Sequence, residues 1–227
     1  MIAVVVPAHD EEDCIGACLK AIAIAARCPS LDAEPVLVIV VLDACSDDTG
    51  EIARSNGVPT LSIHARNVGV ARAQGAQLAL DGGARWLAFT DADSIVAPDW
   101  LSKQLALRSD AVCGTVEVRD WGSYGEPMRQ HYAATYTDAD GHSHIHGANF
   151  GVSAAAYLGA GGFPPLACSE DVALVDALRL NGASIAWSAA PRVVTSARRN
   201  FRAAGGFGDT LSRVERENAQ KALRLAA

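Results

Sequence analysis

The stretch IAVVVPAHDEE, residues 2–12, decides the fold, because a short apolar run passes directly into a turn rich in carboxylates. The same arrangement recurs in VLVIVVLDACSDDT, residues 36–49, and in WLAFTDAD, residues 86–93. Continuous runs of β-branched and other apolar residues are typical of strands that helices cover on both faces. We therefore predict strands at residues 2–6, 36–42, 60–63 and 86–90.

Segments with helical periodicity separate and follow these runs. They predict helices at residues 13–27, 49–55, 68–80, 171–180 and 209–225, and the pattern of the last helix predicts that Leu211, Val214, Ala219 and Leu223 face inward. Strands that alternate with helices form βαβ units, so the expected class is α/β, with a mainly parallel central sheet flanked by helices. A chain of 227 residues can bury one such core, and we expect a single domain.

Composition and charge exclude several classes of protein. Half of the residues are hydrophobic and 20% are charged, as in ordinary globular proteins. A net charge of -7 argues against a nucleic-acid partner, because phosphate backbones are bound by clustered basic residues. The longest apolar run, residues 36–42, is far shorter than the roughly 20 residues of a membrane-spanning helix, and the N-terminus does not resemble a signal peptide. We expect a cytoplasmic protein without a transmembrane segment, and leave open whether residues 209–225 pack on the domain, contact a partner or lie on a membrane surface.

Carboxylates follow three of the predicted strands. Glu11 follows the first strand, Asp43 the second, and Asp91 and Asp93 the fourth. Ligands of open α/β sheets bind beyond the carboxyl ends of the strands, so these side chains are predicted to converge on one rim. Asp91 and Asp93 point to the same side in extended geometry and offer the hard oxygen ligands that Mg²⁺ or Mn²⁺ prefers. For residues 46–49, helix capping and turn formation remain an alternative explanation.

These runs resemble the donor half of family 2 glycosyltransferases. HGANF at residues 146–150, GGF at 161–163 and SEDV at 169–172 resemble the acceptor side of the same family, and the match covers about residues 2–200 in order and spacing. Asp10 stands where Asn is usual, and Ala44 and Cys45 stand where Asp-Gly is common. The Gln-x-x-Arg-Trp motif of the processive synthases is absent, which favours a single-transfer enzyme.

The resemblance implies a GT-A fold in one domain, with a donor half at residues 1–107, an acceptor half at 108–200 and a C-terminal helix at 201–227. It implies a nucleotide-diphosphate sugar as donor and an unidentified hydroxyl as acceptor. Asp43 would accept a hydrogen bond from the base, and Arg72 would approach the base or the diphosphate unless it is a surface helical arginine. The implied nucleotide-sugar residues are Pro7, Ala8, His9, Glu11, Asp43, Arg72, Asp91 and Ala92.

The resemblance also implies a metal and a base. Mn²⁺ or Mg²⁺ would be held by Asp93, with Asp91 assisting, and would stabilise the leaving diphosphate. Asp171 is the expected general base and Glu170 the second candidate, while helix capping is the rival explanation for residues 169–171. A base on the far side of the sugar from the diphosphate makes the transfer a single displacement with inversion. No histidine follows Asp171 to complete a metal shell.

Two other functions remain open at this stage. A sugar-1-phosphate nucleotidyltransferase also binds a nucleotide on an α/β rim, but its glycine-rich basic loop after the first strand is missing. A catalytically silent nucleotide-sugar binding module would bind the donor without releasing nucleoside diphosphate.

Several aromatic side chains in the second half have more than one interpretation. The alternating His142, His144 and His146 would share one face of a strand and form an acceptor-site wall or a solvated face, because no Cys or carboxylate is spaced to complete a metal site. Trp121 could stack on an acceptor sugar or anchor its loop. Trp86 and Trp100 are expected in the core.

Overall fold

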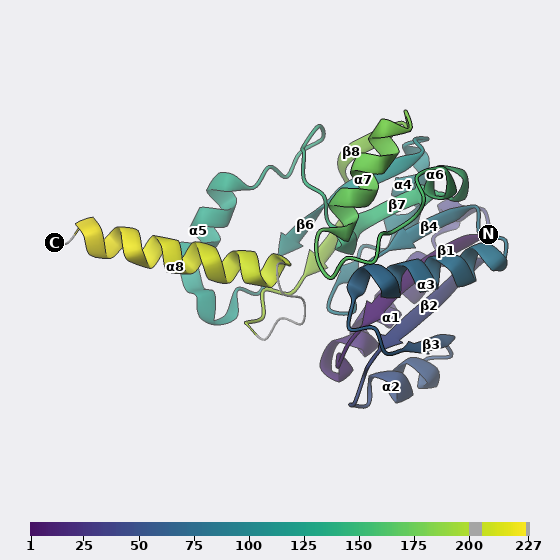
Figure 1. Ribbon diagram of the computed structural model, residues 1–227, viewed down its shortest axis with the longest axis horizontal. Helices are drawn as coiled ribbons and strands as arrows, with labels where there is room; N and C mark the ends of the chain where they lie inside the picture. The colour runs from purple at the N-terminus through teal and green to yellow at the C-terminus, as the bar shows by residue number, and fades with distance from the viewer. Residues whose placement is uncertain (200–205, 226–227) are drawn as a thin grey trace.

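The computed structural model contains an eight-stranded sheet with helices on both faces (Figure 1), and it describes residues 1–199 and 206–225, with side-chain surroundings through residue 217. The strands are β1 (Ile2–Ala8), β2 (Val36–Asp43), β3 (Thr60–Ile63), β4 (Trp86–Phe89), β5 (Ile95–Val96), β6 (Ala111–Val118), β7 (Phe150–Ser153) and β8 (Ile185–Thr195). The helices are α1 (Glu12–Ala25), α2 (Thr49–Ser55), α3 (Val68–Asp81), α4 (Trp100–Ala106), α5 (Gly125–Thr135), α6 (Ala154–Gly159), α7 (Glu170–Leu180) and α8 (Phe207–Leu225). Every predicted strand and helix is present, with its ends within two residues of the prediction.

The first half of the sheet is parallel, as predicted. The strand order is β3-β2-β1-β4-β7-β6-β8-β5, and β1 pairs in parallel with both β2 and β4. The chain therefore leaves β1 toward β2 and β3 and later returns on the other side of β1 as β4. Such a reversal opens a crevice at the carboxyl ends of the two strands. The segments after β1 and β4 line this crevice.

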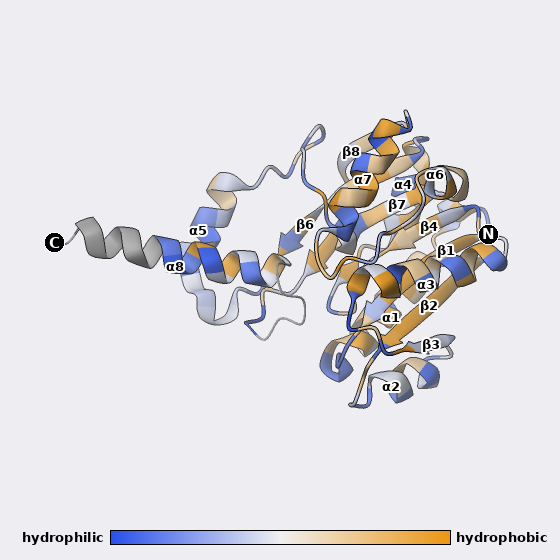
Figure 2. Cartoon of the chain, viewed as in Figure 1, coloured by the Kyte–Doolittle hydropathy of each residue, from blue (hydrophilic) through white to orange (hydrophobic). Residues whose placement is uncertain are grey.

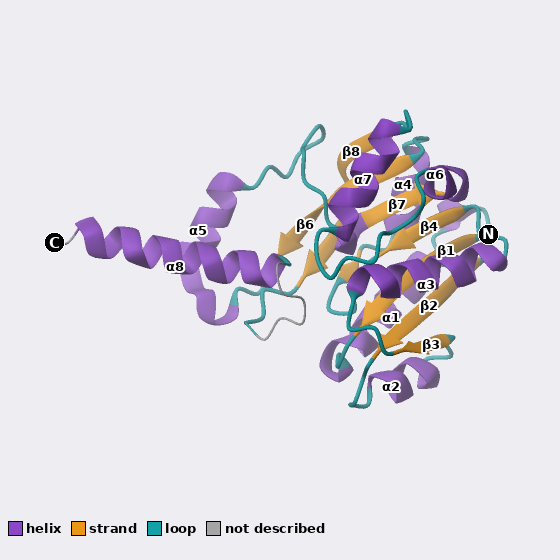
Figure 3. Ribbon diagram, viewed as in Figure 1, coloured by secondary structure: helices purple, strands orange, loops and turns teal. Residues whose placement is uncertain are grey.

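The second half of the sheet mixes strand directions, which the sequence did not predict. β7 runs antiparallel to β4 and β6, and β8 runs parallel to β6 (Figure 3). The short β5 pairs antiparallel with β8. β5 has only 2 residues, β7 contains Gly151 and Ser153 among its 4, and β8 carries Pro191 near a register shift opposite Gly114 and Val116. These strands lack the continuous apolar run by which β1, β2 and β4 are recognised.

Alternate residues of β1 feed two separate cores. Val4 and Val6 face α1 and α4, whereas Ala3 and Val5 face α3 and α7, and all four are fully buried. Figure 2 shows the resulting apolar strands at the centre of the molecule. Each fully buried aliphatic side chain contributes about 1.5–3 kcal/mol, so β1 is stabilised from both faces. Trp86 and Trp100 belong to the first of these cores, as expected.

A smaller third cluster joins α5 to the start of α8, and the two helices lie together at one end of the sheet (Figure 1). Leu211 is buried in this cluster and Val214 packs against it, as predicted from the pattern of α8. The predicted inward positions Ala219 and Leu223 lie outside the residues whose side-chain surroundings are described. No helix in the described part of the chain is long and apolar enough to cross a membrane. Peripheral membrane contact and a cytoplasmic location remain predictions.

Gly75→Ala is expected to lower the free energy of unfolding by about 1–3 kcal/mol, because α3 approaches the sheet too closely for a side chain at this position. A Cβ at Gly75 would overlap Cγ1 of Val5 and lie 2.9 Å from Cγ2 of Val41. Both valines are fully buried and β-branched, so neither side chain can rotate away. Urea denaturation measures the change.

Gly159→Ala is the matched control, since a Cβ there would meet nothing within 4 Å. This variant should be as stable as the parent or slightly more stable. Equal unfolding free energies for the two variants would contradict the close approach of α3.

Candidate active site

A buried arginine joins the two halves of the molecule at the carboxyl ends of the central strands. Arg72, on the first turns of α3, is 4% exposed. Its guanidinium lies 2.5 Å from Oδ1 of Asp91, just beyond β4, and also pairs with Glu170, the first residue of α7. The interpretation of Arg72 as a surface helical arginine is therefore wrong. The side chain is a buried cation held between one carboxylate from each half.

The space for this guanidinium depends on the segment 146–150. A Cβ at Gly147 would overlap the guanidinium of Arg72, and the ring of Phe163 lies beside it, with Cζ of Arg72 5.9 Å from the ring centroid. The backbone N–H of Gly147 donates to Oδ2 of Asp171 at 2.8 Å. Asp171, the predicted base, is thus attached to the loop that encloses Arg72.

The side chain of Ser169 does not cap α7, and of the described side chains there only Asp171 accepts from an N–H of the first turn. Ser169 occupies the N-cap position with a φ of 60° and its side chain makes no capping hydrogen bond. Oδ1 of Asp171 accepts from the adjacent N–H of Val172, and Glu170 is 3% exposed in its pair with Arg72. The two acidic residues therefore differ: Glu170 is buried in an ion pair, and Asp171 is only partly buried.

A second arginine crosses the rim from the segment after β8. Arg198 donates to Oε2 of Glu11 at 2.6 Å, pairs with the other oxygen of Glu11 as well, and lies 3.3 Å from Oδ2 of Asp93. Sequence reasoning missed this role. The available signal was the basic run at residues 198–202, of which residues 200–202 lie outside the described part of the chain.

The carboxylates outnumber the arginines at this rim. Burial, followed by the negative charge of Asp91, raises the pKa of Asp93 to about 7, although Arg198 lies nearby. A divalent cation bound beside such a buried carboxylate would stabilise its charged form, and carboxylate oxygens are the hard ligands that Mn²⁺ and Mg²⁺ prefer. Asp93, with Asp91 two residues before it, is thus a suitable donor set for Mn²⁺ or Mg²⁺.

Asp43 has a structural task at the end of β2. Its two carboxylate oxygens accept from the backbone N–H groups of Ala65, Arg66 and Asn67 at 2.7–2.8 Å, and the side chain is 5% exposed. The backbone oxygen of Asp43 contacts Nδ1 of His9 at 2.6 Å. Asp43 therefore fixes the turn that leads into α3 and so the position of Arg72. Its predicted contact with a base remains a prediction.

The remaining predicted donor-side residues lie at the carboxyl end of β1 or beside Asp91. Pro7 and Ala8 are the last two residues of β1, and Ala92 is buried between Asp91 and Asp93. The rim thus brings together the predicted residues after β1, β2 and β4, and Arg72 connects it to α7.

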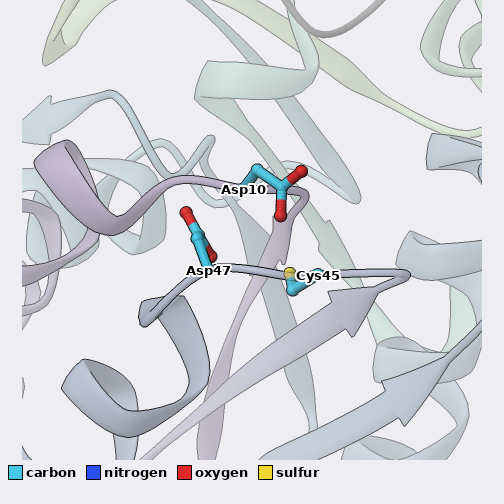
Figure 4. Close-up of side chains that lie close together, drawn as sticks. All are labelled: Asp10, Cys45 and Asp47. Carbon is cyan, nitrogen blue, oxygen red and sulfur yellow. The ribbon is translucent and has the colours of Figure 1, made fainter.

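Another acidic group lies in the loops after β1 and β2. Figure 4 shows Asp10, Cys45 and Asp47 close together, with potential ligand atoms within 4.8 Å of one another. These atoms have partners in the loops: Asp10 accepts from the N–H of Ser46, Asp47 accepts from Thr49, and the thiol of Cys45 donates to the backbone oxygen of Ala8. The N–H of Ser46 is also the main cause that holds the pKa of Asp10 below its usual value. Hydrogen bonds between the two loops therefore explain why these three side chains lie close together.

The three alternating histidines lie in a loop rather than on a strand, which corrects the sequence-based expectation. Their rings stack in sequence, with centroids 5.5 Å apart for His142 and His144 and 5.9 Å apart for His144 and His146, and Tyr136 stacks on His144 at 4.0 Å. His142 is 4% exposed, so the interpretation as a solvated face is wrong for it. Burial lowers the pKa of His146 to about 4, so this ring is neutral near pH 7.

Trp121 is a loop anchor. It is 9% exposed and packs against Tyr132 with ring centroids 5.1 Å apart, inside the cluster formed by α5 and α8. Its ring is therefore engaged within the protein instead of being presented to an acceptor sugar.

Comparison with known proteins identifies the family of this chain. A sequence profile described as Glycosyl transferase family 2 matches residues 3–158, which include the carboxylates after β1, β2 and β4. The chain belongs to glycosyl transferase family 2. No curated protein matches the sequence.

Solved structures of other glycosyltransferases share the GT-A fold with this protein. S. aureus TarS 1-349 in complex with UDP-GlcNAc has a TM-score of 0.67 at 16% identity, over 94% of this chain and 65% of that chain. The mannosyltransferase PcManGT from Pyrobaculum calidifontis, in complex with GDP-Man and Mn²⁺, has a TM-score of 0.66 at 18% identity, over 88% of this chain and 57% of that chain. Glucosyl-3-phosphoglycerate synthase from Mycobacterium tuberculosis, in complex with Mn²⁺, UDP and glucosyl-3-phosphoglycerate, has a TM-score of 0.61 at 19% identity, over 87% of this chain and 72% of that chain. In a second crystal structure of TarS 1-349, this chain covers 60% of the length of that protein.

Arg72→Met is expected to lower the free energy of unfolding by about 3–5 kcal/mol, because it leaves Glu170 buried without a counter-ion. Adding Glu170→Gln to this variant should restore part of the loss. The two single variants and the double variant form a cycle whose coupling energy should be about 1–3 kcal/mol. Urea denaturation of all four proteins gives this value.

Arg85→Met provides the matched control, since Arg85 is exposed and pairs with Glu34 at the surface. Its unfolding free energy should change by less than about 1 kcal/mol. A cycle without coupling between Arg72 and Glu170 would show that their contact does not link the two halves energetically.

Proposed function

We propose that this protein transfers a hexosyl group from a nucleotide-diphosphate sugar to an acceptor hydroxyl, with inversion and with Mn²⁺ or Mg²⁺ bound at Asp93. The observation that carries the proposal is the chain of contacts from Asp91 through Arg72 to Glu170, next to Asp171. It holds the carboxylates after β4 in a fixed relation to the carboxylate at the start of α7. A transferase needs such a relation, because leaving group and attacking hydroxyl lie on opposite sides of the sugar.

The donor is assigned to the rim at the carboxyl ends of β1, β2 and β4. Backbone atoms of Pro7, Ala8 and His9 and the side chain of Glu11 line the nucleoside in this proposal. Asp43 already accepts three backbone N–H groups, and a carboxylate has about four lone-pair sites, so one acceptor position is left for the base. The titles of the similar structures name UDP, UDP-GlcNAc and GDP-Man, which supports a nucleotide-diphosphate sugar as the donor class.

Asp93, assisted by Asp91, would hold the metal. When bound, a divalent cation there supplies Lewis-acid stabilisation of the charge that develops on the diphosphate as the sugar leaves. Burial, followed by the negative charge of Asp91, raises the pKa of Asp93, and a cation there would offset both effects; the Mn²⁺ named with two of the similar structures also supports this assignment.

Asp171 is assigned as the general base and Glu170 as a positioning residue. The N–H of Gly147 orients one oxygen of Asp171, and the partly exposed side chain can reach an acceptor hydroxyl. Glu170 is buried and neutralised by Arg72, so it is a poor proton acceptor for an incoming substrate. Arg72 is likewise assigned to positioning rather than to direct contact with the diphosphate. Removal of the acceptor proton opposite the leaving group makes the reaction a single displacement with inversion.

The proposed activity predicts release of nucleoside diphosphate from one class of donor. UDP and GDP sugars should be screened for binding by mass spectrometry and then for nucleoside diphosphate release with Mn²⁺ or Mg²⁺. Chelation of the metal, or the substitution Asp93→Asn, should abolish release. Asp99→Asn, at the start of α4 where the side chain makes no capping hydrogen bond, is the control and should release nucleotide like the parent.

Other products would identify other functions. Formation of nucleoside triphosphate and sugar-1-phosphate from the donor and pyrophosphate would indicate a nucleotidyltransferase. Donor-dependent stabilisation without any release would indicate a silent binding module. Full activity after chelation would contradict the metal at Asp93.

Asp171→Asn should reduce transfer by a factor on the order of 10²–10⁴ and leave donor affinity nearly unchanged, because the amide keeps one acceptor oxygen but cannot take the proton. Steady-state turnover and calorimetric donor affinity measure the two effects. Asp176→Asn, on the same helix and paired at the surface with Arg179, is the matched control and should behave like the parent. Normal turnover in Asp171→Asn would assign the proton acceptor to another group.

A further inference from the structure

Arg198 differs from Arg72 in how it is held. Arg72 is enclosed, with both terminal nitrogens paired to Asp91 and Glu170, although its Nε, like that of Arg198, has no partner among the described residues. The side chain of Arg198 is 24% exposed and reaches the rim from the opposite end of the chain. Its contacts to Glu11 use both terminal nitrogens, whereas its contact to Asp93 is a single one at 3.3 Å. Of the two arginines, Arg198 is therefore the one that can exchange partners.

We propose that Arg198 is an exchangeable counter-ion of the donor site: it neutralises Glu11 and Asp93 in the ligand-free protein, gives up Asp93 to a divalent cation, and then binds the diphosphate of the donor. The inference rests on the proposed function and adds a role for a side chain that the function does not otherwise require.

Charge and geometry support the exchange. A guanidinium at 3.3 Å and a divalent cation cannot both occupy the same side of the Asp93 carboxylate, and the cation carries twice the charge. A metal bound at Asp93 therefore repels the guanidinium away from that oxygen. The displaced guanidinium would then pair with the diphosphate, the anion that the metal recruits.

The guanidinium is suited to that second partner. Its planar fork of donors matches phosphate oxygens in bidentate geometry. Nε of Arg198 is buried and has no hydrogen-bond partner among the described residues, so the side chain holds one donor that its contacts to Glu11 and Asp93 do not use. A movement toward a diphosphate would satisfy this donor, and such a buried unpaired group is otherwise unfavourable.

The proposal predicts opposite effects of one substitution on two ligands. Arg198→Gln should bind Mn²⁺ about tenfold more tightly than the parent in the absence of nucleotide, because the competing cation is gone; tenfold corresponds to one charged hydrogen bond. The same variant should bind UDP about tenfold more weakly at saturating Mn²⁺. Electron paramagnetic resonance of free Mn²⁺ gives the first affinity, and calorimetry with UDP gives the second.

Two further variants make the result specific. Arg199→Gln removes the same charge from the neighbouring residue, which pairs with Glu215 and Ser123 and not with the rim, so both affinities should stay at the parent values. Arg198→Lys keeps the charge and should stay close to the parent for Mn²⁺; if Arg198→Gln is too unstable to measure, Arg198→Met removes the same charge and should show the same tenfold gain.

Unchanged or weaker Mn²⁺ affinity in Arg198→Gln would overturn the exchange, as would unchanged UDP affinity. These outcomes are separate from failure of the proposed function. If the parent transfers sugar while Arg198→Gln binds both ligands like the parent, the function stands and the exchange is wrong. If the parent releases no nucleotide from any donor while the two affinities shift in opposite directions, the exchange stands in a binding protein.

Discussion

The buried guanidinium of Arg72 is the constraint on which the site depends. Removing a guanidinium from water is costly, and the cost is offset only when carboxylates of good geometry surround it. Here one carboxylate, Asp91, comes from the first half of the sheet and the other, Glu170, from the second. The close seating of α3 at Gly75 and the absent side chain at Gly147 make room for this arrangement. The two ion pairs of Arg72 therefore fix the distance between the segment after β4 and the start of α7.

Sequence alone predicted the parallel half of the sheet and the place of the rim. Those predictions succeed because β1, β2 and β4 are buried on both faces and read as continuous apolar runs, and because the position of a carboxylate after a strand determines which edge it occupies. Asp93 was identified in this way, whereas Asp171, which lies in the first turn of a helix, was identified from the resemblance to the family. Their roles in metal binding and proton transfer remain to be measured.

The sequence could not predict partners that the fold brings together from distant positions. Glu170 is 98 residues from Arg72, and Arg198 is 187 residues from Glu11, so neither pair leaves a local pattern. In the second half, β5 and β7 are short and β8 contains Pro191, and the strand directions follow from packing rather than from composition. Histidine occupies every second position of residues 142–146, as inward residues do in a strand. These histidines instead lie in a loop where their rings stack on one another, so a period of two occurs here without a sheet.

The pairing of β5 with β8 sets an order on assembly. Ile95 of β5 pairs with Val194 of β8, so β5 can join the sheet only after β8, the last strand of the sheet in chain order, has been synthesised. The βαβ units of the first half involve neighbouring segments, and contacts between neighbours form faster than contacts across long separations. During synthesis, the strand edge at β5 and the carboxylates that meet Arg198 are therefore left open after β1 to β4 are complete. This interval exposes an unpaired edge and uncompensated charge, which is where chaperone binding or misassembly would act on the nascent chain.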